Sequence, residues 1–145
     1  MILIKILFIT ICLMLGVIYL QSGLIKLRSI YAFKNIIQSY ELLNNEHIEK
    51  VVALIIPVLE IYIALSLILF KNLLLVSAIG GFLQIIFIAI MIEKYGKKLP
   101  YGCGCFGIQA PSKIDLKHIY LNICFFILFL CIGIYDMSSW LLVER

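Results

Sequence analysis

Four long hydrophobic runs, nearly free of charged residues, constrain this chain of 145 residues more than any other feature. At a rise of 1.5 Å per residue, a helix of about 20 residues crosses a hydrocarbon core about 30 Å thick. Backbone polar groups in lipid must be paired internally, so we expect these runs to be helices. The predicted spans cover residues of about 6–25, 51–70, 72–92 and 118–141.

The composition supports a membrane protein with a single domain. Hydrophobic residues make up 64% of the chain and charged residues 14%, against about 45–50% and 25% in an average soluble domain. The four spans use most of residues 1–145, which leaves no room for a separate catalytic domain. The sequence therefore predicts an all-α fold, an integral membrane four-helix bundle that crosses the cell membrane several times.

The connection between the first two spans differs in character from the spans themselves. Ile30, Phe33, Ile37 and Tyr40 recur at helical spacing, with polar and charged residues between them. This pattern predicts an amphipathic helix that lies at the membrane interface. A solvated loop with incidental apolar residues is the alternative.

The segment 93–117 carries the most specific chemical signal in the chain. Its glycines and prolines exclude a continuous helix, and Cys103 and Cys105 stand in it with one glycine between them. Such a pair can close a small, strained disulfide ring, and strained disulfides exchange readily. Lys97 and Lys98 nearby favour the thiolate, which is the form that attacks disulfides. We therefore interpret residues 93–117 as a redox loop that performs thiol–disulfide exchange.

Two other interpretations of this pair stay open at this point. Cys103 and Cys105 are also suitable ligands for a soft metal such as Zn²⁺ or Cu(I), with His118 as a third ligand. Because the chain has no second pair of cysteines with this spacing, we assign no metal site. The other alternative is a glycine-rich turn with inert cysteines.

Polar residues inside the spans predict a pocket near one face of the membrane. A carboxylate at the centre of a transmembrane helix costs roughly 2.5–3.5 kcal/mol, so Glu60 should have a partner or be protonated. Gln84 is expected at the same depth, about 12–14 Å from the end that carries the long connections. Lys26 and Asn122 close their spans toward that end. We predict that Lys26, Gln84 and Asn122 form a substrate or quinone pocket, although hydrogen bonding between helices would also explain such residues.

Glu60 is the candidate proton carrier of this set. We expect it to accept or relay the proton that leaves when the Cys103 thiol becomes a thiolate. Lys26 would hold the charge of the carboxylate if the end of the first span packs close enough. Cys103, Cys105 and Glu60 are thus the predicted catalytic residues.

The positive charges are distributed unevenly about the predicted spans. Four crossings place both termini on one face and both long connections on the other, which we call the loop side. Nine of the 12 Lys and Arg residues are expected on the loop side, which the positive-inside rule predicts to be cytoplasmic. Because these residues are scattered between apolar runs, they do not predict nucleic-acid binding. A secreted client would instead require the loop side to face outward, so the sequence leaves two orientations open.

The order of these motifs resembles one family of membrane proteins. The shared features are Ser-Gly-Leu-Ile-Lys-Leu at residues 22–27, Pro-x-x-Glu at 57–60 and Cys-Gly-Cys-Phe-Gly at 103–107. Together they resemble the MauE family of methylamine utilisation proteins, which is related to DoxX-like four-helix proteins. MauE proteins are associated with the maturation of disulfide-rich partners beside a thioredoxin-like companion. Family members tend to have Arg-Asn at the start of the last helix, where this chain has Leu-Asn at 121–122.

The resemblance implies roles for particular residues and partners. It implies that Cys103 and Cys105 are a redox pair, with Lys26, Glu60 and Asn122 as the polar set around them. The predicted function is that of a membrane-embedded thiol–disulfide redox protein, a candidate oxidoreductase that assists the maturation of a partner. The expected partners are membrane lipid and either a thioredoxin-like protein or a disulfide-containing client, with a quinone as a candidate electron acceptor. A noncatalytic membrane helper or a soft-metal-binding membrane protein is the alternative.

Overall fold

Four long helices, one short helix and a pair of very short strands form the fold in the computed structural model, which describes residues 2–41, 45–99 and 112–143. The elements in chain order are α1 (Ile2–Arg28), α2 (Ile30–Ser39), α3 (Glu46–Ile68), α4 (Leu73–Glu93), β1 (Lys98–Leu99), β2 (Ser112–Lys113) and α5 (Leu116–Val143). By length and composition, α1, α3, α4 and part of α5 can each cross a membrane. The predicted fold class, a four-helix membrane bundle with an amphipathic helix between the first two spans, is confirmed.

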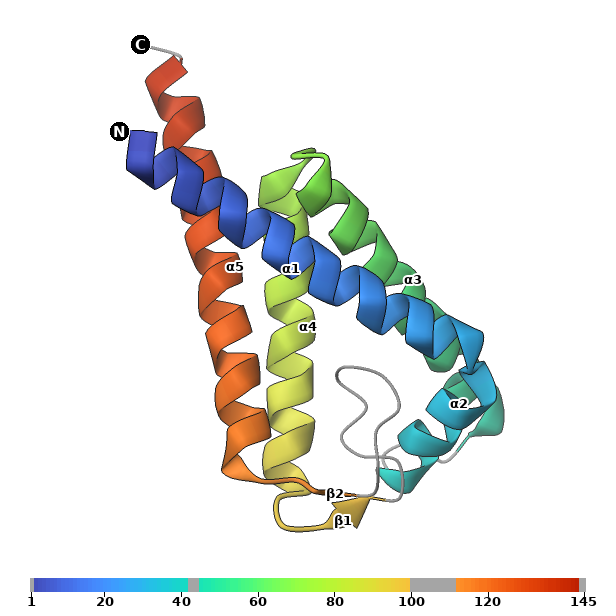
Figure 1. The fold of residues 1–145 in the computed structure, drawn as a ribbon. Coiled ribbons are helices and arrows are strands. Elements are labelled where there is room, and N and C mark those ends of the chain that lie inside the picture. The colour runs from blue at the N-terminus through green and yellow to red at the C-terminus, as the bar shows by residue number, and fades with distance from the viewer. Residues whose placement is uncertain (1, 42–44, 100–111, 144–145) are drawn as a thin grey trace.

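The long helices pack as two pairs (Figure 1). α1 lies along α3 and α4 lies along α5, and the contacts between the pairs are fewer. Tyr19 of α1 meets Phe129 of α5 edge to face, with the ring centroids 5.4 Å apart, in the core where the pairs meet. Near the termini, Phe8 stacks on Tyr135 at 4.2 Å. The start of α1 and the end of α5 lie at one end of the bundle, and α2, β1 and β2 lie at the other (Figure 1).

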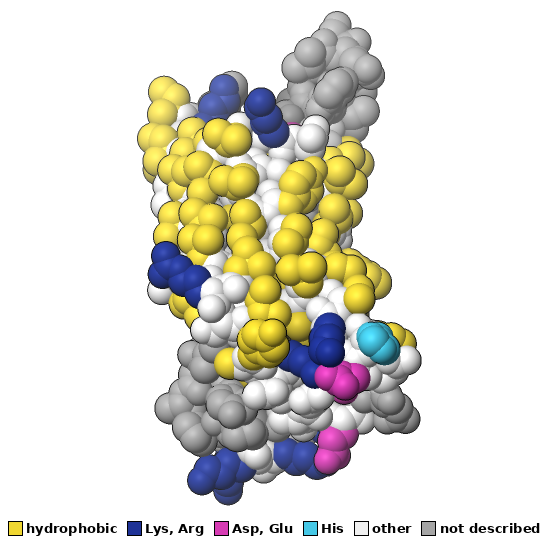
Figure 2. Space-filling model, turned by 90° about the vertical axis from the view of Figure 1, so that its right-hand side faces the viewer, with side chains coloured by type: hydrophobic (Ala, Val, Ile, Leu, Met, Phe, Trp, Pro, Cys, Tyr) yellow, Lys and Arg dark blue, Asp and Glu magenta, His cyan; other side chains and the backbone are white. Residues whose placement is uncertain are grey.

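A hydrophobic surface surrounds the middle of the bundle. Figure 2 shows apolar side chains covering this region, with Lys and Arg side chains toward both ends. Large apolar residues such as Leu75, Phe82 and Ile127 are more than half exposed. In water this surface would be unfavourable, but in a bilayer it faces lipid.

The short helix α2 covers the loop-side end of the bundle. Phe33 and Ile36 on one face are buried, whereas Tyr31 on the other face is 84% exposed. The buried face belongs to a second apolar cluster, which consists of Phe33, Ile36, Tyr40, Ala53, Met91, Ile114 and Ile119. The amphipathic pattern therefore packs α2 against α3, within a cluster that also holds Met91 of α4 and Ile119 of α5.

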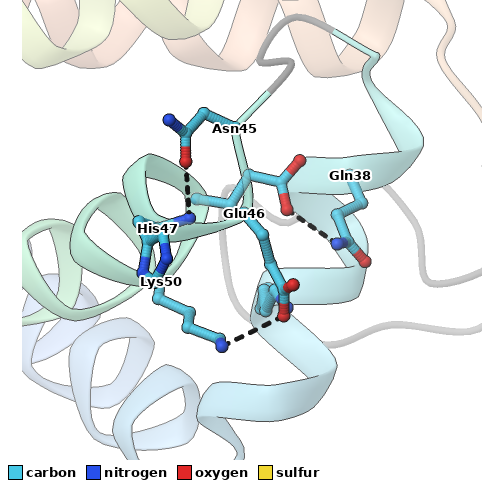
Figure 3. Close-up of polar contacts among 7 residues, drawn as sticks. Gln38, Asn45, Glu46, His47 and Lys50 are labelled. Atoms are coloured by element: carbon cyan, nitrogen blue, oxygen red, sulfur yellow. Dashed lines mark hydrogen bonds and ion pairs between the residues drawn. The ribbon is translucent and has the colours of Figure 1, made fainter.

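Polar contacts join α2 to the first turns of α3 (Figure 3). Asn45 caps α3 by accepting a hydrogen bond of 2.9 Å from the backbone N–H of His47. Lys34 Nζ lies 2.8 Å from Glu46 Oε1, and Gln38 Nε2 donates to Glu49 at 2.6 Å. The cap explains why α3 begins before the uncharged run that starts at residue 51, because a helix continues through charged residues where its first N–H groups are satisfied.

The antiparallel pairing of β1 and β2 has no clear signal in the sequence. Lys98 pairs with Lys113, and Leu99 pairs with Ser112. Gly96, with a positive φ of 77°, donates its N–H to the carbonyl of Ile114 at 3.0 Å and extends the pairing toward α4. The two strands therefore hold residues 99 and 112 opposite each other at the loop-side end.

Candidate functional site

Lys26 and Glu60 form a buried ion pair between α1 and α3. Lys26 Nζ lies 2.5 Å from Glu60 Oε1, and the two residues are 0% and 1% exposed. The second carboxylate oxygen accepts a hydrogen bond of 3.3 Å from Ser22 Oγ. Removing two charges from water is costly, and close pairing with further hydrogen bonds offsets much of that cost. The structure thus gives the carboxylate of the third helix a partner for each oxygen.

The local sequence explains how the two helices come close enough for this contact. Ser22 and Lys26 are four residues apart and therefore share one face of α1. Between them, Gly23 lies so close to α3 that an added Cβ would be 2.9 Å from the carbonyl oxygen of Pro57 and 2.8 Å from Ile61 Cγ1. A larger residue at position 23 would push α1 away from Glu60. The glycine and the two polar residues of this motif therefore serve the same contact.

Two aromatic rings enclose the ammonium group of Lys26. Its Nζ lies 5.1 Å from the ring centroid of Phe33 and 5.5 Å from that of Phe87. Both distances are within the range of cation–π attraction, which strengthens when the cation is desolvated. Because Phe33 comes from α2 and Phe87 from α4, Lys26 links four helices at the loop-side end.

Gln84 and Asn122 lie on the second helix pair, and each has one amide oxygen without a partner. Gln84 Nε2 donates to the hydroxyl of Tyr19, while Gln84 Oε1 accepts no hydrogen bond. Asn122 Nδ2 donates to the carbonyl of His118 at 2.8 Å, while Asn122 Oδ1 accepts none. The two residues are 3% and 1% exposed. An unsatisfied buried acceptor costs about 1–3 kcal/mol, so these two amide oxygens require an explanation.

A small cavity separates the two helix pairs at this level. It is lined by Ile18, Tyr19, Ser22, Glu60, Gln84, Phe87 and Asn122. Its volume of about 10 Å³ is close to the minimum for one water molecule and far below the roughly 300–1,000 Å³ of small-molecule sites. Glu60, Gln84 and Asn122 therefore share one cavity, and a quinone ring does not fit within it.

At the start of α5, a carboxylate and a histidine contact each other. Asp115 Oδ1 lies 2.6 Å from His118 Nδ1 and accepts the backbone N–H of His118 at 3.3 Å. Desolvation acts to raise the pKa of Asp115, but the hydrogen bonds from His118 and the charges of His118 and Lys117 hold this pKa below its ordinary value. Within residues 2–41, 45–99 and 112–143, no group of three His, Cys, Asp or Glu side chains is arranged to hold a metal ion.

The sequence of this chain matches a known protein family. Residues 4–136 match the family described as methylamine utilisation protein MauE. The match covers nearly the whole chain. The chain belongs to the MauE family. The curated proteins and the solved structures that were compared gave no match. It is therefore a multi-pass membrane protein of the methylamine utilisation type, as the order of its motifs predicted.

In this MauE protein the predicted polar residues lie together, but in two groups. Lys26 contacts Glu60 directly, whereas Gln84 and Asn122 face them across the cavity. The predicted redox pair, Cys103 and Cys105, lies outside the described residues. Of the remaining cysteines, Cys12 is buried, and Cys124 and Cys131 are exposed on α5.

Sequence reasoning did not find three aromatic residues of the site. Tyr19 accepts the hydrogen bond from Gln84, and Phe33 and Phe87 enclose the ammonium of Lys26. Only Tyr19 carries a usable signal, because it stands three residues before Ser22 and so shares its helix face. Phe87 sits in an apolar run where an aromatic residue is ordinary.

Proposed function

We propose that this MauE protein is a thiol–disulfide redox protein of the cell membrane that assists disulfide formation or maturation of a partner protein through Cys103 and Cys105. The observation that carries the proposal is the buried Lys26–Glu60 pair at the loop-side end of the bundle. An intramembrane ion pair with a polar cavity beside it is more typical of a functional site than of helix packing.

The base of the cysteine segment lies at the same end of the bundle as this ion pair. Ile114, next to β2, and Met91, in the last turns of α4, pack in one cluster with Phe33, whose ring contacts Lys26. Cys103 follows Leu99 of β1 by four residues, and an extended chain spans at most about 3.3–3.6 Å per residue. The length of the chain therefore limits the Cα of Cys103 to within about 14 Å of the strand end, and this tether supports a shared role for the two features.

The proposed reaction is ordinary thiol–disulfide exchange. A client thiolate attacks one sulfur of the Cys103–Cys105 disulfide, the bond between the two sulfurs breaks, and a mixed disulfide forms. A second client thiolate then displaces the cysteine, so the client is oxidised by two electrons and the pair is reduced to two thiols. The disulfide of a thioredoxin-like partner, or a quinone dissolved in the bilayer, takes up these two electrons to regenerate the pair.

The proposed role of Glu60 and Lys26 is to help the transfer of the proton that a thiol of the pair releases. When a thiol of the pair ionises, its proton must leave toward a base at the loop-side end. Glu60 is a carboxylate there, and Lys26 and Ser22 hold it in place through contacts of 2.5 and 3.3 Å. The positive charge of Lys26 also favours a nearby thiolate over a thiol.

Differential alkylation of the purified protein in a bilayer mimetic tests the redox assignment. Replacing Cys124 and Cys131 by serine removes the exposed thiols of α5, and Cys12, which is buried, serves as an internal control for unfolding. We expect Cys103 and Cys105 to be protected from alkylation as isolated and to react together after mild reductant. A pair that stays reduced with oxidants and binds Zn²⁺ or Cu(I) stoichiometrically would overturn the proposal in favour of a soft-metal-binding protein.

A second experiment separates proton chemistry from helix packing. Glu60→Gln keeps the shape of the side chain and removes its titratable group. We expect slower exchange at the Cys103–Cys105 pair and an altered dependence of its rate on pH. Glu93→Gln, which makes the same change in an exposed carboxylate at the end of α4, is the control. A Glu60→Gln variant that folds normally with unchanged rate and pH dependence would leave Glu60 as a packing residue only.

A further inference from the structure

We infer that the cavity between the two helix pairs is the binding site of a single water molecule, which donates its hydrogens to Gln84 Oε1 and Asn122 Oδ1. Both oxygens are buried and without a partner, and both residues line the cavity. This inference does not depend on the proposed redox function.

The size and polarity of the cavity specify the ligand. Its volume of about 10 Å³ admits one water and nothing much larger. Two acceptors without donors call for a molecule with two hydrogens to give, and water has two. Buried waters typically make about three hydrogen bonds, and Tyr19 and Ser22, which line the same cavity, carry hydroxyl groups for a third.

The orientation of Asn122 is set by its own backbone contact. The carbonyl of His118 can only accept, so the NH₂ group of Asn122 must face it at 2.8 Å. The amide oxygen of Asn122 therefore faces away from the carbonyl of His118. The unpartnered acceptor on α5 is therefore a consequence of hydrogen-bond chemistry rather than of an arbitrary amide assignment.

A monovalent cation suits this cavity less well than water. The carboxylate of Glu60 is already balanced by the ammonium of Lys26, and its second oxygen accepts from Ser22. A cation would therefore add an uncompensated charge inside the membrane, which is unfavourable. A neutral donor satisfies the two amide oxygens without that cost.

The water gives α4 and α5 a polar connection beside the ion pair. Gln84 belongs to α4 and Asn122 to α5, while Glu60 of α3 and Ser22 of α1 line the opposite wall. A water bound to both amides thus joins α4 to α5 within the cavity that Glu60 and Ser22 also line.

X-ray hydroxyl-radical labelling tests for the water, because a bound water generates radicals where it lies and modifies adjacent side chains. Tyr19, which lines the cavity and is 4% exposed, is the reporter. Phe129, which is 0% exposed and meets Tyr19 edge to face but does not line this cavity, is the reference. We expect Tyr19 to be labelled above Phe129 in the wild type and to fall to the level of Phe129 in Asn122→Leu. Labelling of Tyr19 no higher than Phe129 in the wild type overturns the inference.

Two further arms keep the test decisive. If Asn122→Leu does not fold, Gln84→Met removes the other acceptor and should reduce the labelling of Tyr19 in the same way. Thermal unfolding of the wild type in NaCl and in choline chloride distinguishes water from a cation. We expect equal unfolding midpoints in both salts. A midpoint that rises saturably with Na⁺ in the wild type but not in Asn122→Leu would show that the cavity binds a cation and not a water.

Discussion

The buried ion pair makes a quantitative prediction about stability. Lys26→Met removes the charge and keeps much of the aliphatic stem, leaving Glu60 buried and unpaired. Removing one partner of a buried pair costs about 3–5 kcal/mol, and the full burial of both side chains leaves little solvent to reduce that figure. Native proteins are stable by only about 5–15 kcal/mol, so the loss should be a large fraction of the total.

The double variant Lys26→Met/Glu60→Met identifies the cause. Without either charge, no uncompensated group remains in the membrane, and apolar replacement of a buried pair is often neutral or stabilising. We therefore expect the double variant to be at least about 2 kcal/mol more stable than the sum of the two single losses predicts. Unfolding by SDS in mixed micelles, followed by circular dichroism, measures all four proteins of the cycle.

An exposed pair in the same chain provides the control. Lys34 lies 2.8 Å from Glu46, whose side chain is 62% exposed and also contacts Lys50. Lys34→Met should cost much less than Lys26→Met, because water solvates the remaining carboxylate. A loss below about 1 kcal/mol for Lys26→Met, or single losses that simply add in the double variant, would refute the reasoning.

Four other substitutions test the packing and the helix ends. Gly23→Ala should lower stability in SDS unfolding by about 1–3 kcal/mol, because its Cβ would overlap α3, whereas Gly81→Ala, with its nearest neighbour at 3.6 Å, should be neutral or stabilising. Asn45→Ala should cost about 1 kcal/mol in the same assay, since it removes the cap of α3. The contribution of Asp115, whose pKa is lowered, should be present above about pH 4 and lost as pH falls further. The unfolding midpoints of wild type and Asp115→Asn should therefore converge in acid, and a constant gap would show that charge plays no part.

The bundle was predictable because each span is a long apolar run in the sequence. A run of about 20 apolar residues has few alternatives to a membrane helix, and the spacing of Phe33 and Tyr40 identified α2 as amphipathic. The strands β1 and β2 were not predictable, since two residues each are too short to show alternation. Their pairing depends on the helices that bring residues 99 and 112 together.

The residues of the site were only partly predictable. The cost of a carboxylate in lipid identified Glu60 and required a partner, and the nearest basic residue of the first span was Lys26. The hydrogen bond between Gln84 and Tyr19 joins helices that are distant in sequence, so it depends on how the two helix pairs meet. No periodic pattern encodes such a contact.

The pairing of β1 with β2 gives the chain a removable insert. Residues 99 and 112 are held opposite each other by strands that continue into α4 and α5. Closing a longer loop across fixed ends costs only about 0.6 kcal/mol for each doubling of its length. The stretch from 100 to 111 can therefore be exchanged for one of different length or chemistry while the anchored helices keep their positions. A change in the length of these twelve residues therefore leaves the contact between Lys26 of α1 and Glu60 of α3 intact, because neither helix adjoins the two strands in the chain.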